Sequence, residues 1–367
     1  MDDKRVGART VTRVTADATT ASRLAAQLLV GPKPSSPEAV TGHLLAVQAQ
    51  DPRGARLSIR PRSDGLTAAD VDRALTDDRS LVITWLNRGT LHLVRSEDLA
   101  WLHALTAPTT FTANARRLVQ EGVTADAAEL GVTVIERSLT DDGPLTRADL
   151  KERLDSAGVP TQGQALVHLL LLASLRGVAV RGPMVGQHQA FVLVRDWLGA
   201  PPAVDREVAL AELARRYLVG HGPATDRDLA KWAGLGLGDA RAALRAIGAE
   251  LDEGPDGLVD LAGRSAASGT PPPTLLGPFD PLLLGWVSRE PIVGSHLTIV
   301  TTNGLFRPFA LVDGRAVATW SLAGGVVELK PFGRLSAAVR AALDREAVEV
   351  LRFVGNGGSP APEGGSV

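Results

Sequence analysis

Cysteine is absent from this chain of 367 residues. Its absence excludes disulfide bonds, thiolate nucleophiles, iron–sulfur clusters and cysteine-based zinc sites. The seven histidines show neither an H-x-x-x-H nor an HExxH spacing, so the sequence predicts no metal site. A P-loop, a G-x-G-x-x-G placed after a strand and a G-x-S-x-G nucleophile elbow are also missing. We therefore expect a protein without a cofactor.

Long apolar runs are missing as well. No segment approaches the roughly 20 apolar residues that a membrane span requires. The first ten residues, MDDKRVGART, are charged and lack the apolar core of a secretory signal, so we expect a cytoplasmic protein. The net charge of −2 argues against a uniformly positive surface, although a local groove can still be basic and bind nucleic acid.

An internal repeat is the most informative pattern. Residues 142–159 (DGPLTRADLKERLDSAGV) and 221–237 (HGPATDRDLAKWAGLGL) share G-P-x-T-x-x-D-L in register. In the first copy Thr146 lies where a helix N-cap belongs, and Asp149 follows three residues later, as in a capping box. The second copy has the same residues at the same places. Each copy therefore predicts a short helix entered through a Gly-Pro turn.

The surroundings of the two copies also match, in the order helix, helix, helix, strand, turn, strand that is typical of a winged helix. Residues 20–95 form a third, more divergent unit that lacks the motif and ends in a β-hairpin, SLVITWLNRGTLHLV, turning at residues 87–89. A Pro/Ser/Gly linker follows residue 265, and strand-like runs come after it at residues 296–302, 306–322 and 325–332.

These patterns predict an α+β fold of tandem winged-helix units followed by a small β-rich domain. The expected divisions are winged-helix units over 20–120, 121–200 and 201–265, a C-terminal β-rich domain over 275–354, and a disordered tail over 355–367. Winged helices often bind DNA, but they also serve as protein-interaction modules, and the fold alone does not decide between these roles.

The stretch LLAVQAQDPRGARLSIRPR, residues 44–62, carries the candidate site. An apolar helix is predicted to run into Gln48 and Gln50, which point to different faces of a helix or to one side of an extended chain. From spacing alone, helix capping with solvent exposure is the simpler interpretation.

A basic segment follows, with only Asp51 as a nearby acid; its arginines are Arg53, Arg56, Arg60 and Arg62. They either neutralise several DNA phosphates or belong to a solvated loop that turns its apolar residues inward. Arg116 and Arg117 extend this surface or form a solvated pair on a helix. His188, in the predicted wing of the second unit, contacts a DNA groove or is an exposed turn residue.

Four blocks occur in a distinctive order: LLAVQAQDPRGARLSIRPR, LVITWLNRGTLHLV, LLGPFDPLLLGW and FRPFALVDGRAVATW. From about residue 20 to 353 the chain resembles the AlkZ/YcaQ-type winged-helix DNA glycosylase family. The resemblance implies tandem winged helices in a C shape around a DNA channel. It also implies excision of bulky N7-alkylated purines, with some members unhooking interstrand crosslinks made by genotoxic natural products. The family's catalytic motif, a Gln, an apolar residue and a Gln or Asp, matches Gln48-Ala49-Gln50.

The chemistry implied by the resemblance explains why two amides suffice. A glutamine does not deprotonate water, but an N7-alkylpurine is already cationic and leaves neutral. Two amide carbonyls then need only to position water and stabilise the developing cation on the sugar. An ordinary purine requires a general acid and is spared. In this interpretation the arginines after the motif line the channel, and a hairpin such as that of Arg88 presses on the duplex.

We therefore expect a monomeric, monofunctional DNA glycosylase that acts on double-stranded DNA in self-resistance or repair. The main alternative is a non-catalytic transcriptional regulator, which predicts a dimer bound to an undamaged palindrome. A scaffold for protein partners is a further alternative, and it predicts no salt-dependent DNA binding.

Overall fold

The computed structural model describes residues 18–264, 269–296, 298–301 and 303–355. Apart from Gly355, which ends the last helix, the tail predicted to be disordered lies outside these residues. None of the described helices is long and apolar enough to cross a membrane.

The first region contains a helical segment over residues 18–26 and the elements α2 (Pro37–Leu44), β1 (Val47–Gln48), α3 (Pro52–Ile59), η1 (Arg60–Arg62), α4 (Ala68–Thr76), β2 (Leu81–Leu86) and β3 (Thr90–Arg95). The predicted hairpin is confirmed, because β2 pairs antiparallel with β3 through the turn η2 (Asn87–Gly89). Two predictions for the candidate stretch were wrong. The helix before the glutamines ends at Leu44, where Leu45 adopts a φ of 66°, and the basic segment after them is a helix rather than a loop.

Two further regions repeat one order of elements. After η3 (Ser96–Asp98) and the long α5 (Leu99–Gln120) come α6 (Ala125–Asp142), α7 (Arg147–Ser156), α8 (Ala165–Leu175), β4 (Ala179–Val185), β5 (His188–Leu193) and α9 (Val194–Leu198). The next region has α10 (Arg206–His221), α11 (Asp226–Ala233), α12 (Leu237–Ala246), β6 (Leu251–Glu253) and β7 (Val259–Leu261). The predicted capping boxes begin both motif helices: the N–H of Asp149 donates to the hydroxyl of Thr146 at 3.3 Å, and the N–H of Asp228 donates to the hydroxyl of Thr225 at 3.1 Å.

One five-stranded sheet, in the order β1-β3-β2-β4-β5, crosses the predicted boundary at residue 120. Ile83 of β2 pairs with Arg181 of β4. Alternation along the strands divides the apolar side chains between two cores. Ile83 faces one core with α4, α6 and α8, whereas Val82 faces the other with α5 and α10. The sheet thus joins segments that the sequence pattern assigns to separate units.

The C-terminal region combines strands and helices: β8 (Thr274–Leu276), η6 (Pro281–Leu283), α13 (Glu290–Val293), β9 (Phe309–Val312), β10 (Arg315–Ala323), β11 (Val326–Pro331) and α14 (Ala337–Gly355). Its sheet has the order β11-β10-β9-β8. Two of the three predicted strand-like runs are confirmed. The run at residues 296–302 forms no strand among its described residues and contributes only an isolated bridge from Val300 to Phe306.

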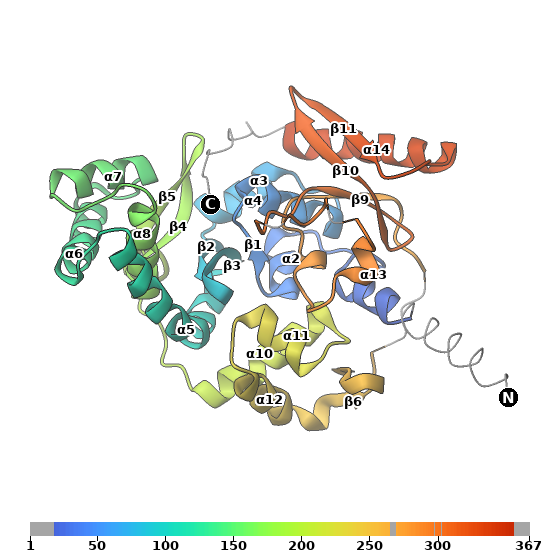
Figure 1. The fold of residues 1–367 in the computed structure, drawn as a ribbon, viewed down its shortest axis with the longest axis horizontal. Coiled ribbons are helices and arrows are strands. Elements are labelled where there is room, and N and C mark those ends of the chain that lie inside the picture. Colours follow the sequence, from blue (N-terminus) through green and yellow to red (C-terminus); the bar gives the residue numbers. More distant parts are fainter. Residues whose placement is uncertain (1–17, 265–268, 297, 302, 356–367) are drawn as a thin grey trace.

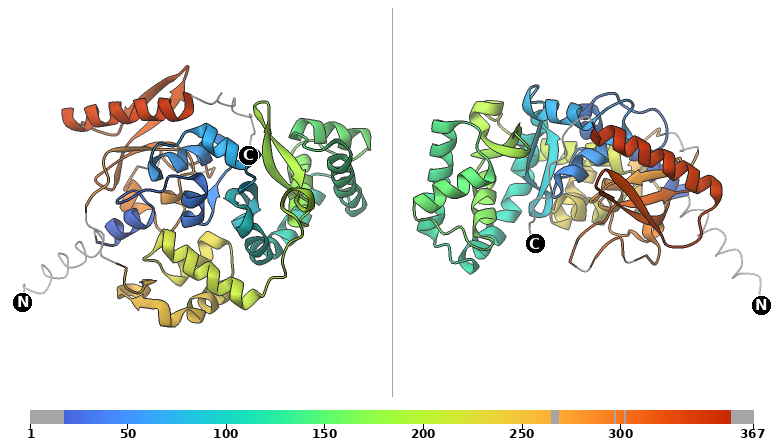
Figure 2. Two further views of the ribbon diagram at one scale, coloured as in Figure 1. Left: turned by 180° about the vertical axis from the view of Figure 1, so that it is seen from behind. Right: turned by 90° about the horizontal axis from the view of Figure 1, so that it is seen from above.

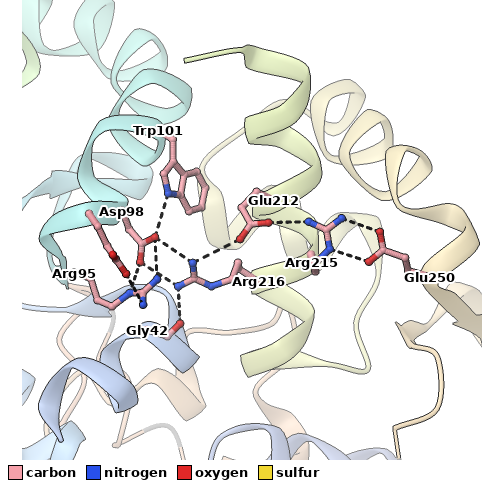
Figure 3. Close-up of polar contacts among 9 residues, drawn as sticks. Gly42, Arg95, Asp98, Trp101, Glu212, Arg215, Arg216 and Glu250 are labelled. Carbon is pink, nitrogen blue, oxygen red and sulfur yellow. Dashed lines mark hydrogen bonds and ion pairs between the residues drawn. The ribbon is translucent and has the colours of Figure 1, made fainter. Parts of the chain in front are cut away.

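Figures 1 and 2 show the first region at the centre, with α6–α8 on one side, α10–α12 on another, and the C-terminal sheet with α14 beyond α3 and α4. Polar contacts attach α10 to the centre (Figure 3). Arg216 donates to Asp98 at 3.0 and 3.1 Å and to the carbonyl of Gly42 at 2.8 Å. Burial of Asp98 opposes ionisation, but hydrogen bonds from Arg95 and Arg216 hold its pKa below the usual value. The ion pair is therefore present at neutral pH.

Candidate active site

The two glutamines lie against β3 at the edge of the five-stranded sheet. Gln48 stands opposite His92 in the β1–β3 ladder, and the N–H of Ala49 donates to the carbonyl of Leu91 at 2.7 Å. The chain then bends at Gln50, and the N–H of Leu91 donates to Oε1 of Gln50 at 2.9 Å instead of to a strand carbonyl. This bond fixes the amide of Gln50. Pairing with an edge of the sheet, rather than a helix end, therefore positions both amides.

Gln48 lies in a row of buried polar side chains on one face of the sheet. Its register partner His92 is also opposite Thr84 of β2, and the three side chains are 6%, 3% and 1% exposed. Arg88 of the β2–β3 turn donates from Nη2 to Oε1 of Gln48 across 3.5 Å. Sequence reasoning missed His92 and Thr84. The detectable signal was their alternation within the hairpin strands, which places them on the same face as Gln48.

His92 is neutral at neutral pH. Burial, together with the charge of Arg88, lowers the pKa of His92 to about 3. Nδ1 lies 2.9 Å from the carbonyl of Thr90, which assigns the proton to Nδ1 and leaves Nε2 as an acceptor. Gln48 is therefore surrounded by neutral polar groups and one guanidinium.

Three of the four arginines predicted to bind phosphates are structural instead. Arg56, Arg60 and Arg62 are 4%, 8% and 0% exposed. Arg56 pairs with Asp72 of α4, and Arg60 donates to Glu346 of α14 at 2.8 Å. This correction has a clear physical reason, because a buried guanidinium that is bonded to a carboxylate is not available to DNA.

Arg62 is the most deeply buried of these three arginines. Its guanidinium donates two hydrogen bonds to Asp280, at 2.7 and 2.9 Å, and a third to the carbonyl of Gln27 at 2.9 Å. Neither partner of the ion pair is exposed. Arg60 and Arg62 thus attach the first region to the C-terminal region.

A cavity of about 340 Å³ opens directly beside the motif, between α3 and the C-terminal sheet. Its lining is Asp51, Arg53, Leu57, Pro278, Arg307, Pro308, Thr319, Trp320, Ser321, Leu322 and Lys330. The walls are largely apolar, and three of the lining side chains are cationic. Asp51 is the N-cap of α3, and its carboxylate accepts a hydrogen bond from the N–H of Gly54 at 2.8 Å.

The remaining predicted DNA-binding residues lie on the surface. Arg88 has a φ of 60° at the hairpin turn and is exposed beside Gln48. Arg116 and Arg117 are exposed on α5, where Arg117 donates to Gln120 at 2.8 Å. His188 is exposed at the tip of the β4–β5 hairpin. Of these four, only Arg88 contacts a glutamine of the motif.

The family model of DNA glycosylase AlkZ-like proteins matches residues 41–353. The chain belongs to the AlkZ-like DNA glycosylase family. It is 29% identical over 342 residues to an interstrand DNA cross-link repair glycosylase of Streptomyces sahachiroi, covering 86% of this chain and 90% of that protein. The solved structure of the DNA glycosylase AlkZ of Streptomyces sahachiroi matches with a TM-score of 0.74 at 26% identity, covering 92% of this chain and 96% of that one.

These matches confirm three predictions for this AlkZ-like protein: the family, a mixed α+β fold and the enzyme class, a DNA glycosylase. They also give the local geometry its chemical context. Gln48 and Gln50 lie within the residues that the family model matches.

Proposed function

We propose that this AlkZ-like glycosylase hydrolyses the N-glycosidic bond of bulky N7-alkylated purines in double-stranded DNA, including purines held in interstrand crosslinks. The observation that carries the proposal is the pair of amides, Gln48 and Gln50, held against β3 while the adjacent carboxylate of Asp51 caps α3. The named activity of the relative from Streptomyces sahachiroi, interstrand cross-link repair, supports the same substrate class.

The amides act on water and on the developing positive charge of the sugar. As the C1′–N9 bond breaks, its electron pair neutralises the alkylated purine, which leaves without protonation. Water adds to C1′ and releases its proton to solvent. The carbonyl of Gln48 orients the water, and Gln50, fixed by its bond from Leu91, stabilises the cationic sugar.

The cavity beside the motif supports a bulky adduct as the substrate. A volume of about 340 Å³ is within the range of sites that hold small organic molecules. Leu57 and Trp320 supply apolar wall, and Arg53 supplies charge. We assign this cavity to the substituent on N7, or to the part of a crosslinking agent that projects from the purine.

We further propose that the repeated regions are winged helices and that the molecule forms a C-shaped channel around the duplex. The repeated order of three helices and two strands supports the winged-helix assignment, and the placement of these regions around the first region supports the channel (Figure 1). The divisions at residues 120, 200 and 265 stay predictions. In this proposal a cytoplasmic monomer contacts the duplex through Arg53, Arg88, Arg116, Arg117 and His188.

Release of the purine from defined duplexes tests the activity. The protein is incubated with an N7-methylguanine duplex and with a duplex crosslinked by a bifunctional alkylating natural product, and hot alkali then reveals abasic sites as strand breaks. We expect Gln48→Ala and Gln50→Ala each to lower the rate by about 10²–10³-fold, as for other positioned dipoles. Gln162→Ala, which changes an exposed glutamine in the turn before α8, is the matched control. Absence of breaks on every alkylated duplex, or full activity in both variants, would refute the proposal.

A further inference from the structure

Three cationic side chains meet where the β2–β3 turn reaches α11. Arg88 donates from Nη1 to the carbonyl of Lys231 at 3.1 Å and also to that of Trp232. The backbones approach closely here, since a Cβ on Gly234 would lie 2.6 Å from the nitrogen of Arg88. Arg88 is therefore held at the C-terminal end of α11, next to Gln48.

The other two cations come from α11 and from the segment before α13. Lys231 donates from Nζ to the carbonyl of Val287 at 3.3 Å, which brings it beside the segment that carries Arg289. The Nε of Arg289 donates to the carbonyl of Leu283 at 2.6 Å, and its guanidinium lies 5.0 Å from the ring centroid of Phe306. Both terminal nitrogens of Arg289 remain available, because none of its contacts within the described part of the chain uses them.

The three cations give this cluster a positive charge. None of the three cations has an ion pair within the described ranges. The negative charge of Asp228 raises the pKa of Lys231, but this carboxylate already accepts a hydrogen bond from Thr225 and pairs with Arg23 at 3.7 Å. Burial, Arg289 and Arg88 together lower the pKa of Lys231, as expected when cations crowd one another. Such repulsion disfavours the folded state unless an anion relieves it.

We propose that Arg88, Lys231 and Arg289 form a binding site for a DNA phosphate beside Gln48. The proposal rests on the proposed function and adds residues that motif reasoning did not identify. A planar guanidinium matches two phosphate oxygens, and an ammonium supplies a point charge with spare donors. A phosphate held here fixes the sugar of the damaged nucleotide near the amides, so that binding energy is used for orientation.

The cluster also joins three segments that are distant in the sequence, namely the β2–β3 turn, α11 and the residues before α13. Bound DNA would therefore tie the first region to α11. A competing interpretation is that Arg88 and Lys231 only stabilise the negative end of α11. That interpretation predicts an effect on stability and none on DNA.

The salt dependence of DNA binding separates the two interpretations. Affinity for an undamaged duplex is measured at several salt concentrations for the full chain and for the variants Lys231→Ala, Arg289→Ala and the double variant. Because the three cations share one phosphate, the double variant should reduce the slope of log Kd against log salt by up to about 0.9, and each single variant should reduce it by less. Arg289→Lys should keep most of the slope, because it keeps the charge.

Arg137→Ala is the control, since Arg137 is 82% exposed on α6 and pairs with Asp141 in its own helix. An unchanged slope in the double variant, with thermal stability either kept or lowered, would overturn the proposal. The proposed function is judged separately by purine release from an N7-methylguanine duplex. If the wild type releases no purine but the double variant still shows the reduced slope, the phosphate site is supported and the proposed glycosylase activity is rejected.

Discussion

Arg62 and Asp280 form an ion pair that water does not reach. Removing two charges from water has a large desolvation penalty, which the two hydrogen bonds between them and the bond to Gln27 offset. Breaking such a pair is more harmful than never forming it, because one charge remains buried without a partner. Arg62 thus stabilises the attachment of the C-terminal region, although its side chain has no exposed surface.

We expect Arg62→Ala to lower the free energy of unfolding by about 3–5 kcal/mol, since it leaves Asp280 buried and unpaired. Urea denaturation measures the change. Arg73→Ala, which removes a guanidinium 57% exposed and paired with Asp70, should lower it by less than about 1 kcal/mol. If Arg62→Ala instead left stability unchanged and reduced the salt slope of DNA binding, the arginine would be a phosphate contact after all.

His221 gives the molecule a measurable acid sensitivity. Burial lowers its pKa to about 3, from about 6.5 in the unfolded chain. Between these pH values the unfolded state binds more protons, so the stability due to this group is complete above pH 6.5 and falls by about 1.4 kcal/mol per pH unit below it. Between pH 7 and pH 4.5, the free energy of unfolding of His221→Gln should therefore fall by about 2–3 kcal/mol less than that of the wild type. Urea titrations at the two pH values measure the difference.

The control for this prediction is His188→Gln, which changes an exposed histidine at a hairpin tip. Equal pH slopes in the wild type and His221→Gln would show that His221 accepts a proton in the folded state as readily as in the unfolded chain.

At the residue scale, the sequence indicated which side chains could take part in chemistry, but it did not indicate which of them are buried. Gln48 and Gln50 were proposed as site residues because a resemblance motif names both positions, and their role stays a prediction. The structural role of Arg62 was not, because its partner Asp280 lies 218 positions away and nothing local indicates the pairing. An arginine followed by others in the chain looks solvated until a distant carboxylate is placed beside it.

At the scale of elements, local signals succeeded where one segment determines its own conformation. The capping boxes of α7 and α11 and the β2–β3 hairpin are such cases. Strand β1 is not: it has two residues and exists only because β3 pairs with it. The cavity beside it is likewise formed by α3 and strands from the other end of the chain.

If this cavity holds the substituent on N7, narrowing it should slow the release of large adducts more than that of small ones. Ser321→Trp places an indole where Ser321 lines the cavity, so release of a bulky N7 adduct should fall by about tenfold or more, while release of N7-methylguanine changes little. Parallel kinetics on the two duplexes measure the ratio. Ala323→Trp, at the exposed end of the same strand β10 and outside the lining, is the matched control. Equal losses on both substrates in Ser321→Trp would show that the cavity does not hold the adduct.

At the scale of the whole molecule, contacts cross the predicted divisions of the chain. The sheet runs from β1 to β5 across a predicted boundary, and Arg60 joins α14 to the first region. The repeat suggested three like modules arranged in series. In the structure the first region contacts all the others.

Because the chain contains one Gln48-Ala49-Gln50 motif, we expect one chain to bind one lesion. Light scattering should give 38.4 kDa for the free protein and a 1:1 complex on a short duplex with a single N7-alkylguanine, whether or not the sequence is palindromic. A dimeric regulator, by contrast, would bind an undamaged palindrome as two chains related by a two-fold axis. Two chains on a palindrome and none on the single-lesion duplex would reject the monomeric glycosylase. Gln48→Ala serves as the reference protein, since loss of chemistry at the amide should leave the 1:1 complex intact and long-lived enough to measure.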